Sequence, residues 1–343
     1  MEYRMLGGSG LEVSALSFGT MTLGGEGRFA AMGNVQVDEA RRQIEICREA
    51  GVNLFDTADA YSSGKSEEVL GQALGAQRKD VVVATKVFFR IEPGANKNGL
   101  SRTHIVESCE ASLRRLGTDY IDLYQAHNFD SLTPLEETLR AFDDLIRTGK
   151  IRYAGCSNYA GWQAMKAAAI SERLGIARYI SQQINYSLLA RDAEHELVPV
   201  GLDQRLGIMA WSPLQFGLLS GKFRRGQARP AESRLNTLDV PGTVEEERHY
   251  RIVDTLAEIA EQRGVSVAQA ALNWVLRKPC VDTVILGARN EQQLRDNLAA
   301  AQWSLTEAEV ARLDEASATA LPYPHWHQQK FAGDRNPPAK ASR

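Results

Sequence analysis

The chain carries, at residues 51–61, the stretch Gly51-Val52-Asn53-Leu54-Phe55-Asp56-Thr57-Ala58-Asp59-Ala60-Tyr61. Its apolar run predicts a buried strand that ends at Asp56, followed by a turn that carries Tyr61. Two later apolar runs end in the same way, with Lys86 after 81–85 and His127 after 121–126. Because the carboxyl ends of parallel barrel strands share one face, where the active sites of such barrels lie, we expect these four side chains to converge.

Strand and helix patterns alternate along the whole chain. We expect eight strands, near residues 15–18, 53–56, 81–86, 121–126, 151–156, 179–184, 207–211 and 281–286, with helices between them. Eight units that do not repeat in sequence predict an α/β fold, a single (β/α)8 TIM barrel. The alternative, an open doubly wound sheet, needs a Gly-x-Gly-x-x-Gly turn after its first strand to bind a dinucleotide in the usual way, and the sequence has none.

Several features lie outside this alternation. Residues 2–13 predict a hairpin that plugs one end of the barrel, and residues 212–245 form a long excursion after the seventh strand. Helix N-caps are expected at Asp38, Ser101, Thr133 (with Pro134 at the first helical position), Ser266, Asn290 and Thr306. Capping boxes are expected where Ser266 is followed by Gln269 and where Thr306 is followed by Glu309. We expect residues 1–319 to form the barrel domain, and the tail 320–343 to fold over its mouth or to be disordered.

Composition excludes several classes of function. The 343 residues are 43% hydrophobic and carry a net charge of -3, which gives no electrostatic reason to expect nucleic acid or a membrane as a partner. No signal-peptide core or long apolar span occurs, so a cytoplasmic location is expected. The four cysteines are scattered and the six histidines form no ligand motif, so no metal is expected.

The four strand-end residues suit the reduction of a carbonyl group. A tyrosine hydroxyl has a pKa near 10, which the Lys86 ammonium would lower, while Asp56 would hold that lysine charged and oriented. His127 could donate a hydrogen bond to the carbonyl oxygen as negative charge grows there. None of them can deliver a hydride, so the site needs a nicotinamide. The simpler alternative is that Asp56 and Lys86 form only a structural ion pair, while Tyr61 and His127 pack in the core.

The remaining strand ends offer groups for a dinucleotide. Ser157, Asn158 and Gln183 could hydrogen-bond the nicotinamide carboxamide, and Trp211 could stack on a ring or pack in the core. The start of the excursion has small residues and a lysine suited to a pyrophosphate, and four arginines follow it, Arg224, Arg225, Arg229 and Arg234. The predicted cofactor-binding residues are Gly19, Thr20, Met21, Asp56, Ser157, Asn158, Gln183, Trp211, Ser212, Pro213, Leu214, Gly217, Leu219, Gly221, Lys222, Gly287, Arg289, Gln293 and Asn297.

The cofactor is expected to be NADPH rather than NADH. Arg289 stands at a helix N-terminus where it could grip a 2′-phosphate, with Gln293 and Asn297 one turn apart to reach the adenine. No acidic residue is placed for the ribose hydroxyls. Asn290 and Gln293 could alternatively form only a cap pair.

The predicted substrate wall is mainly apolar and suits an uncharged aldehyde or ketone. It comprises Met21, Phe88, Phe89, Asn128 and Phe129, with Phe216 beside them.

Three stretches are similar to one known family. They are Gly51 to Tyr61 followed by Gly64-Lys65-Ser66-Glu67, then 113–122, Leu-Arg-Arg-Leu-Gly-Thr-Asp-Tyr-Ile-Asp, and 149–158, Gly-Lys-Ile-Arg-Tyr-Ala-Gly-Cys-Ser-Asn. On these the chain resembles the aldo-keto reductases from Arg4 to about Ala301. The resemblance implies Tyr61 as the general acid, Lys86 and Asp56 as the groups that tune its acidity, and His127 as the residue that orients the carbonyl.

The expected function is therefore reversible, NADPH-dependent reduction of aldehydes or ketones. An alternative is a nucleotide-sensing regulatory subunit with slow turnover, similar to the related potassium-channel β subunits, although a full set of four catalytic groups favours an enzyme. A barrel hydrolase would need a carboxylate pair or a metal cluster at the mouth, and neither is indicated.

Overall fold

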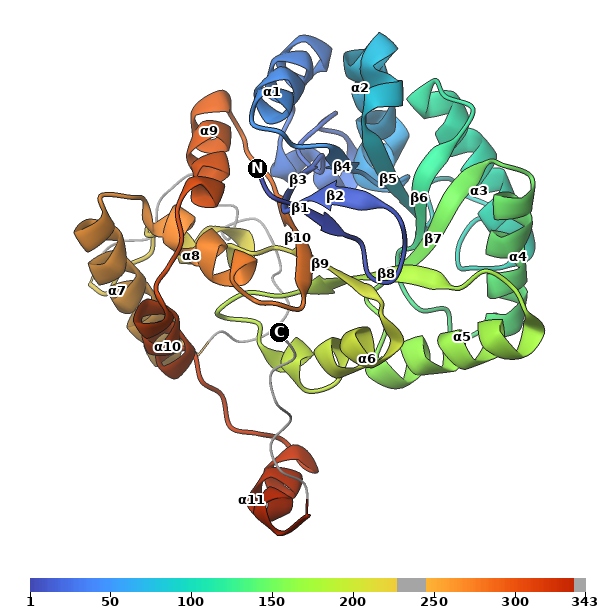
Figure 1. Cartoon of the computed structure of the whole chain (residues 1–343). Helices are drawn as coiled ribbons and strands as arrows, with labels where there is room; N and C mark the ends of the chain where they lie inside the picture. The colour runs from blue at the N-terminus through green and yellow to red at the C-terminus, as the bar shows by residue number, and fades with distance from the viewer. Residues whose placement is uncertain (227–244, 336–343) are drawn as a thin grey trace.

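Eight parallel strands close into a barrel that is ringed by helices (Figure 1). The computed structural model describes residues 1–226 and 245–335. The barrel strands are β3 (Leu16–Gly19), β4 (Leu54–Asp56), β5 (Val82–Val87), β6 (Ile121–Ala126), β7 (Ile151–Ser157), β8 (Tyr179–Asn185), β9 (Gly207–Trp211) and β10 (Val281–Leu286), hydrogen-bonded in that order with β10 pairing back to β3. The predicted (β/α)8 barrel is confirmed.

The helices alternate with these strands and cover the outside of the barrel. They are α1 (Val37–Glu49), α2 (Lys65–Leu74), α3 (Arg102–Leu116), α4 (Leu135–Arg147), α5 (Gly161–Leu174), α6 (Leu197–Gln204), α7 (Glu246–Arg263), α8 (Val267–Leu276), α9 (Glu291–Ala299), α10 (Glu307–Ala316) and α11 (His325–Arg335). Short 3-10 segments η1 (Gly27–Met32), η2 (Tyr61–Gly64) and η5 (Gln215–Ser220) lie in the connections. None of the helices in the described part of the chain is both long and apolar enough to cross a membrane.

The strands are buried on both faces, which is why they read as nearly continuous apolar runs. Outward-facing side chains pack against the helices in one large core. A second, smaller core fills the barrel interior and consists of Leu6, Val13, Leu54, Val82, Ala84, Leu123, Met209 and Ile285. The polar strand ends stand above this inner core.

The N-terminal hairpin closes the amino-terminal end of the barrel, as predicted. It pairs β1 (Tyr3–Met5) with β2 (Glu12–Ser14), and two of its apolar residues belong to the inner core. Its turn bonds to the strand starts, because Gly7 N donates to Asp282 Oδ2 and Gly8 N donates to Arg205 O. Gly7 has a φ of +60°, and a Cβ there would lie 2.4 Å from Gly207 N, so this contact requires glycine.

Helix caps show where the sequence patterns succeed. The side chains of Ser101, Ser266, Asn290 and Thr306 accept hydrogen bonds from the expected backbone N–H groups, and Thr306 with Glu309 forms the full capping box. The box predicted for Ser266 is incomplete, because Gln269 Oε1 accepts from Trp303 Nε1 instead of from the Ser266 N–H.

Two predicted caps are wrong. Helix α1 begins at Val37, with Gln36 as its N-cap, and Asp38 lies within the first turn, where it pairs with Arg41. Helix α4 begins at Leu135, with Pro134 at the cap position. Thr133 does not cap it because its hydroxyl donates to Asp130 Oδ2, whose carboxylate organises the preceding turn.

The tail differs from both alternatives considered for it. Helix α11 stands clear of the barrel rather than over its mouth (Figure 1). The ring of His325 stacks on His195 at 5.2 Å, and His325 Nε2 lies 3.5 Å from Glu196 Oε1. Residues 336–343 lie outside the described part of the chain.

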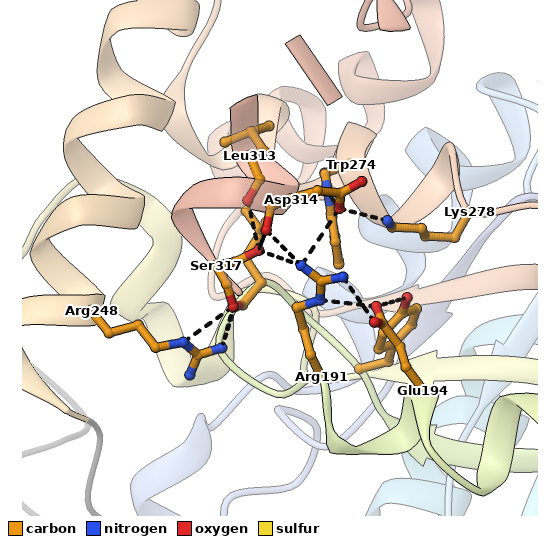
Figure 2. Close-up of polar contacts among 10 residues, drawn as sticks. Arg191, Glu194, Arg248, Trp274, Lys278, Leu313, Asp314 and Ser317 are labelled. Atoms are coloured by element: carbon orange, nitrogen blue, oxygen red, sulfur yellow. Dashed lines mark hydrogen bonds and ion pairs between the residues drawn. The ribbon is translucent and has the colours of Figure 1, made fainter. Parts of the chain in front are cut away.

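A polar cluster fastens the end of α10 to the barrel (Figure 2). Arg191, in the loop after β8, donates from Nη1 to Asp314 O and to Ser317 Oγ, and from Nη2 to Glu194 Oε2. Arg248 on α7 donates to Ser317 O. The Asp314 carboxylate accepts from Trp274 Nε1 on α8 and from Lys278 Nζ just after that helix. The cluster therefore joins α10 to α7, to α8 and to the mouth of the barrel.

We expect Arg191→Ala to lower the free energy of unfolding by about 2–3 kcal/mol, because it removes charge-assisted hydrogen bonds from a mostly buried cluster. Urea unfolding followed by circular dichroism measures the change. Arg225→Ala, which removes an exposed ion pair with Glu247, serves as the control and should leave the urea midpoint unchanged. Equal effects for the two variants would contradict this role of the cluster.

Candidate active site

The centre of the site is a buried ion pair between neighbouring strands. Asp56 ends β4, and Lys86 lies near the end of β5. Lys86 Nζ is 2.6 Å from Asp56 Oδ1, and the two side chains are 0% and 3% exposed. A second donor contact runs from Lys86 Nζ to Thr57 O at 2.7 Å. The ammonium is thus held on three sides once Tyr61 is included.

Tyr61 reaches this ion pair through the turn after β4. Asp59 N donates to Lys86 O, and Tyr61 N donates to Ala58 O, which folds the turn back over the end of β5. Lys86 Nζ then lies 3.3 Å from Tyr61 Oη. The phenol oxygen and the ammonium are therefore within mutual reach, as proton transfer at the phenol requires.

The backbone after Tyr61 is held in a left-handed conformation at three successive residues. Ser62, Ser63 and Gly64 have φ values of 49°, 55° and 94°. The Ser62 hydroxyl donates to Leu23 O and accepts from Gly25 N, which compensates for the unfavourable backbone angle. A Cβ on Gly64 would lie 2.8 Å from Arg115 Cδ. The turn that aims Tyr61 is therefore specified by its own sequence and by α3.

The acidity of Tyr61 differs from the sequence-based expectation. Burial raises the pKa of Tyr61, the charge of Asp56 raises it further, and the charge and hydrogen bond of Lys86 lower it. The sum lies above the ordinary tyrosine pKa, so the expected net lowering is wrong, because desolvation of the phenolate outweighs the attraction of the ammonium. Tyr61 consequently holds its proton at neutral pH.

Lys86 stays charged despite its burial. Burial lowers the pKa of Lys86, but Asp56 and Tyr61 together raise it above the ordinary value. The ammonium can therefore stabilise negative charge that develops on the Tyr61 oxygen.

His127 faces Tyr61 from the end of β6. Their ring centroids are 5.7 Å apart at an interplanar angle of 78°. The backbone of His127 is fixed because His127 N donates to Val87 O and Asn158 Nδ2 donates to His127 O. The four predicted side chains therefore meet at one end of the barrel.

Three further residues lie at this site; the sequence analysis missed Gln125 and Phe29, and it predicted Gln183 only as a cofactor residue. Gln125 Nε2 and Gln183 Nε2 both donate to Asp56 Oδ2, at 3.3 and 2.8 Å. Gln125 could have been found by strand periodicity, because it points inward two residues before His127. The ring of Phe29, in η1, packs edge-on against Tyr61 at 5.2 Å. No sequence pattern marks Phe29, because η1 lies in an irregular connection.

Asp56, Tyr61, Lys86 and His127 are called the tetrad below. The predicted cofactor residues that follow β3 and lie on β7 and β8 surround this tetrad. Thr20 is buried, and its N and Oγ1 both donate to Asp56 O. Ser157 Oγ donates to Gln183 O. Because Gln183 Nε2 donates to Asp56, a carboxamide contact from Gln183 would use its Oε1. Gly19 and Met21 flank Thr20 and are partly exposed.

The mouth also holds polar atoms that a ligand could satisfy. Trp211, at the end of β9, is in register with Asn185 of β8. Trp211 Nε1 and Asn185 Oδ1 are buried, and neither has a hydrogen-bond partner among the described residues. A donor and an acceptor left open at the same strand ends suit a polar ring with a carboxamide, so the residues present fit a nicotinamide.

The start of the excursion after β9 has an unusual backbone. Ser212, Gln215 and Phe216 have positive φ values although none is glycine, a feature that concentrates at functional sites. A Cβ on Gly217 or on Gly287 would meet only one neighbouring atom, at 4.0 Å, so there is room for a ligand to approach their backbone. Pro213 and Leu219 are buried, whereas Leu214, Gly221 and Lys222 are more exposed.

The arginines of this segment are largely engaged in the fold. Arg224 Nε donates to Gly221 O, and Arg225 makes a two-pronged ion pair with Glu247. Arg229 and Arg234 lie outside the described residues.

The predicted adenine end is built around the start of α9. Asn290 Oδ1 accepts from Gln293 N, and Gln293 Oε1 accepts from Arg289 N, so the cap pair is present. Asn297 is buried and donates to Gly287 O. The side chains of Gln293 and Asn297 therefore both bond to the backbone of the turn that carries Arg289. Arg289 itself is exposed.

The predicted substrate wall divides into two parts. Phe89 lies 4.9 Å from the His127 ring and packs edge-on against Phe88. Phe129 instead packs against Tyr159 and Trp162. Asn128 Oδ1 accepts from Phe129 N.

A surface cleft of about 570 Å³ lies at the opposite end of the barrel, beside the hairpin. Its main polar side chains already have partners, since Arg4 donates to Val281 O and Asn273 Nδ2 donates to Trp303 O. The mouth, and not this cleft, is therefore the candidate active site. The described residues hold no cluster of three or more potential metal ligands.

Comparison with known proteins agrees with this geometry. The aldo/keto reductase family profile matches residues 15–318. The chain belongs to the aldo/keto reductase family. Membership supports an oxidoreductase that acts on small carbonyl compounds with a nicotinamide cofactor.

Named relatives of this aldo/keto reductase fall into two groups. It is 40% identical over 308 residues to a probable voltage-gated potassium channel subunit beta of Arabidopsis thaliana, covering 88% of this chain and 91% of that protein. It is 38% identical over 326 residues to the uncharacterized oxidoreductase YrpG of Bacillus subtilis, covering 91% and 94%. It is 35% identical over 336 residues to versiconal hemiacetal acetate reductase of Aspergillus parasiticus, covering 92% and 96%.

We expect Lys86→Met to destabilise this aldo/keto reductase by about 3–5 kcal/mol, because it leaves the Asp56 carboxylate buried without its cation. The double variant Lys86→Met with Asp56→Asn should cost less than the sum of the two single changes, because the second change removes the uncompensated charge. Urea unfolding of the four proteins gives this cycle. Additive effects would contradict a coupled ion pair.

Proposed function

We propose that this protein is an NADPH-dependent reductase of aldehydes or ketones, and that the reaction is reversible toward alcohol oxidation. The observation that supports this most directly is the 3.3 Å contact between Tyr61 Oη and the buried Lys86 ammonium. It joins a protonated acid to a fixed positive charge at the barrel mouth, beside unsatisfied polar groups that suit a nicotinamide. When bound, NADPH supplies the hydride that the protein's own side chains cannot provide.

The side chains perform the proton chemistry. Tyr61 donates its hydroxyl proton to the carbonyl oxygen, and the resulting phenolate is stabilised by Lys86. Asp56 keeps Lys86 charged and in place, helped by the Gln183 hydrogen bond to its second oxygen. His127 donates a hydrogen bond to the same carbonyl oxygen and so aligns it with Tyr61. In the oxidative direction the Tyr61 phenolate accepts the alcohol proton.

The substrate side of the site is apolar. Phe29 and Phe89 contact the rings of Tyr61 and His127, and Met21, Phe88 and Asn128 are the other predicted wall residues on this side. An aldehyde or ketone without strong charge fits these surroundings. Phe129 contributes from the side of α5.

NADPH is proposed over NADH on the chemistry of the α9 turn. Arg289 is exposed at the start of a helix, with its backbone fixed by Gln293. A guanidinium there suits a 2′-phosphate, which only NADPH carries. Gln293 and Asn297 are proposed to lie beside the adenine.

A second candidate function is a nucleotide-sensing subunit of a larger assembly. It is favoured by the relatives named as potassium channel β subunits, in Arabidopsis thaliana, rice and Schizosaccharomyces pombe. A panel of aldehydes, ketones and quinones assayed by NADPH oxidation separates the two candidates, because a sensor turns over all of them slowly.

We expect Tyr61→Phe to lower the rate of NADPH-dependent carbonyl reduction by about 10²–10⁴-fold, because it removes the proton donor. The dissociation constant for NADPH, measured by fluorescence titration, should change little. Tyr3→Phe, which alters an exposed tyrosine of the hairpin, is the matched control and should retain the parent rate. Turnover of Tyr61→Phe at the parent rate would rule out this role of Tyr61.

We expect Arg289→Ala to weaken NADPH binding by about 10–100-fold, because a hydrogen-bonded charge pair with phosphate is lost, and to weaken NADH binding much less. Titration with each nucleotide measures the difference. Arg295→Ala removes the same charge from an exposed position of the same helix and serves as the control. Equal weakening of both nucleotides by Arg289→Ala would eliminate the 2′-phosphate role.

A further inference from the structure

The carboxyl group of Asp59 is buried close to the ion pair of Lys86 and Asp56 and to the carboxylate of Glu67. Asp59 stands midway between Asp56 and Tyr61 in the turn, and its backbone N donates to Lys86 O at 3.2 Å. Its side chain is completely buried. Neither carboxyl oxygen accepts a hydrogen bond from another side chain of the described residues, and the Ala60 N–H is the one backbone group that favours its charged form.

The charged groups around Asp59 are already paired with one another. Arg115 Nε, on α3, lies 2.6 Å from Glu67 Oε2 on α2, and Thr85 Oγ1 donates to Glu67 Oε1 at 2.5 Å. Lys86 is paired with Asp56. Two cations thus meet two carboxylates, and the charges that shift the pKa of Asp59 include no further cation among the described residues. An ionised Asp59 would add an uncompensated negative charge to a fully buried cluster.

The shift in the pKa of Asp59 agrees with this lack of a partner cation. Burial raises the pKa of Asp59 well above its ordinary value, and the Glu67 carboxylate raises it further, while Arg115 and Lys86 only partly oppose them. The charge of Asp59 in turn raises the pKa of Tyr61, and that of Tyr124 on β6, after burial has raised each. Asp59 and Tyr61 therefore compete to ionise beside the same lysine.

We propose that Asp59 carries its proton in the folded protein at neutral pH, and that its ionisation in alkaline solution precedes and opposes that of Tyr61. While Asp59 is neutral, the positive charge of Lys86 is available to the Tyr61 oxygen as the phenol gives up its proton. Once Asp59 ionises, that charge is shared between two neighbours. Asp59 is thus a positioning residue that acts through Lys86 and Tyr61, and only the catalytic meaning of this effect rests on the proposed reductase function.

The protonation of Asp59 is tested by the pH dependence of unfolding. An unfolded aspartate loses its proton near pH 3.9, whereas folded Asp59 keeps it, so stability is full below the unfolded pKa and falls as pH rises toward the folded pKa. Asp59→Asn lacks this loss. Urea unfolding should show the unfolding constant of the parent, divided by that of Asp59→Asn, rising about tenfold per pH unit from pH 5 to pH 8.

Asp282→Asn is the matched control for this measurement. Asp282 lies at the other end of the barrel, and burial raises its pKa to about 6. Its ratio should rise only up to about pH 6 and stay level above that. A level ratio for Asp59→Asn between pH 6 and pH 8 would show that Asp59 is ionised in the folded protein, and would overturn the proposal.

The coupling to Tyr61 is tested without any substrate. The absorbance of tyrosinate near 295 nm is followed with pH, and the Tyr61 contribution is obtained by subtracting the same titration of the corresponding Tyr61→Phe protein. In Asp59→Asn this step should move to lower pH by about one unit, because a neighbouring negative charge is gone. A step at the parent pH, or none before alkaline unfolding, contradicts the coupling.

These readouts are independent of the proposed activity. If no carbonyl compound is reduced, the proposed function fails while both titrations still decide the state of Asp59.

Discussion

The buried pair of Lys86 and Asp56 is the interaction on which the mouth of this barrel depends. A lysine ammonium removed from water is costly unless a carboxylate and further acceptors surround it. Parallel pairing of β4 with β5 supplies them, because it sets Asp56 beside the strand that carries Lys86, and the turn after Asp56 brings Thr57 O to the same ammonium. Fold and chemistry are therefore joined at one contact.

This constraint extends outward through the helices. The turn after Tyr61 leads directly into α2, which contributes Glu67, and α3 contributes Arg115 to pair with it. Gly64 lies against the Arg115 side chain, so the left-handed turn packs directly on α3. Glu67 raises the pKa of Asp59 and Arg115 lowers it, and the charge of Asp59 raises the pKa of Tyr61, so residues of two helices act on Tyr61 through Asp59.

Much of the barrel and of the tetrad could be predicted from the sequence, because both follow from local patterns. Apolar runs mark the strands, and the residue at the end of each run lies at the mouth of a parallel barrel. The sequence therefore predicted that Asp56, Lys86 and His127 lie close together. What could not be predicted depends on competition between neighbours. Thr133 does not cap α4, because its hydroxyl donates to Asp130. Phe29 contacts Tyr61 from an irregular segment that no sequence pattern marks. The pKa of Tyr61 is raised and not lowered as expected, because burial opposes ionisation and the extent of burial is a property of the folded interior.

The two groups of named relatives pose a question that the tetrad alone does not answer. Proteins named as reductases and as channel subunits are nearly equally similar to this chain over almost its whole length. A site that binds a nicotinamide and holds a proton donor serves either a catalyst or a sensor of the nucleotide, and the difference lies in how fast a substrate reaches and leaves it. Here Phe29 and Phe89 border the rings of Tyr61 and His127, and the loop that carries Phe29 is tied to the Tyr61 turn through Ser62 and Gly25. The segment that carries Phe29 is thus fastened to the same turn that positions the phenol, so a displacement of that segment is expected to move Tyr61 as well. For the proposed reductase, the packing around Tyr61 is therefore expected to affect turnover together with the proton that Tyr61 carries.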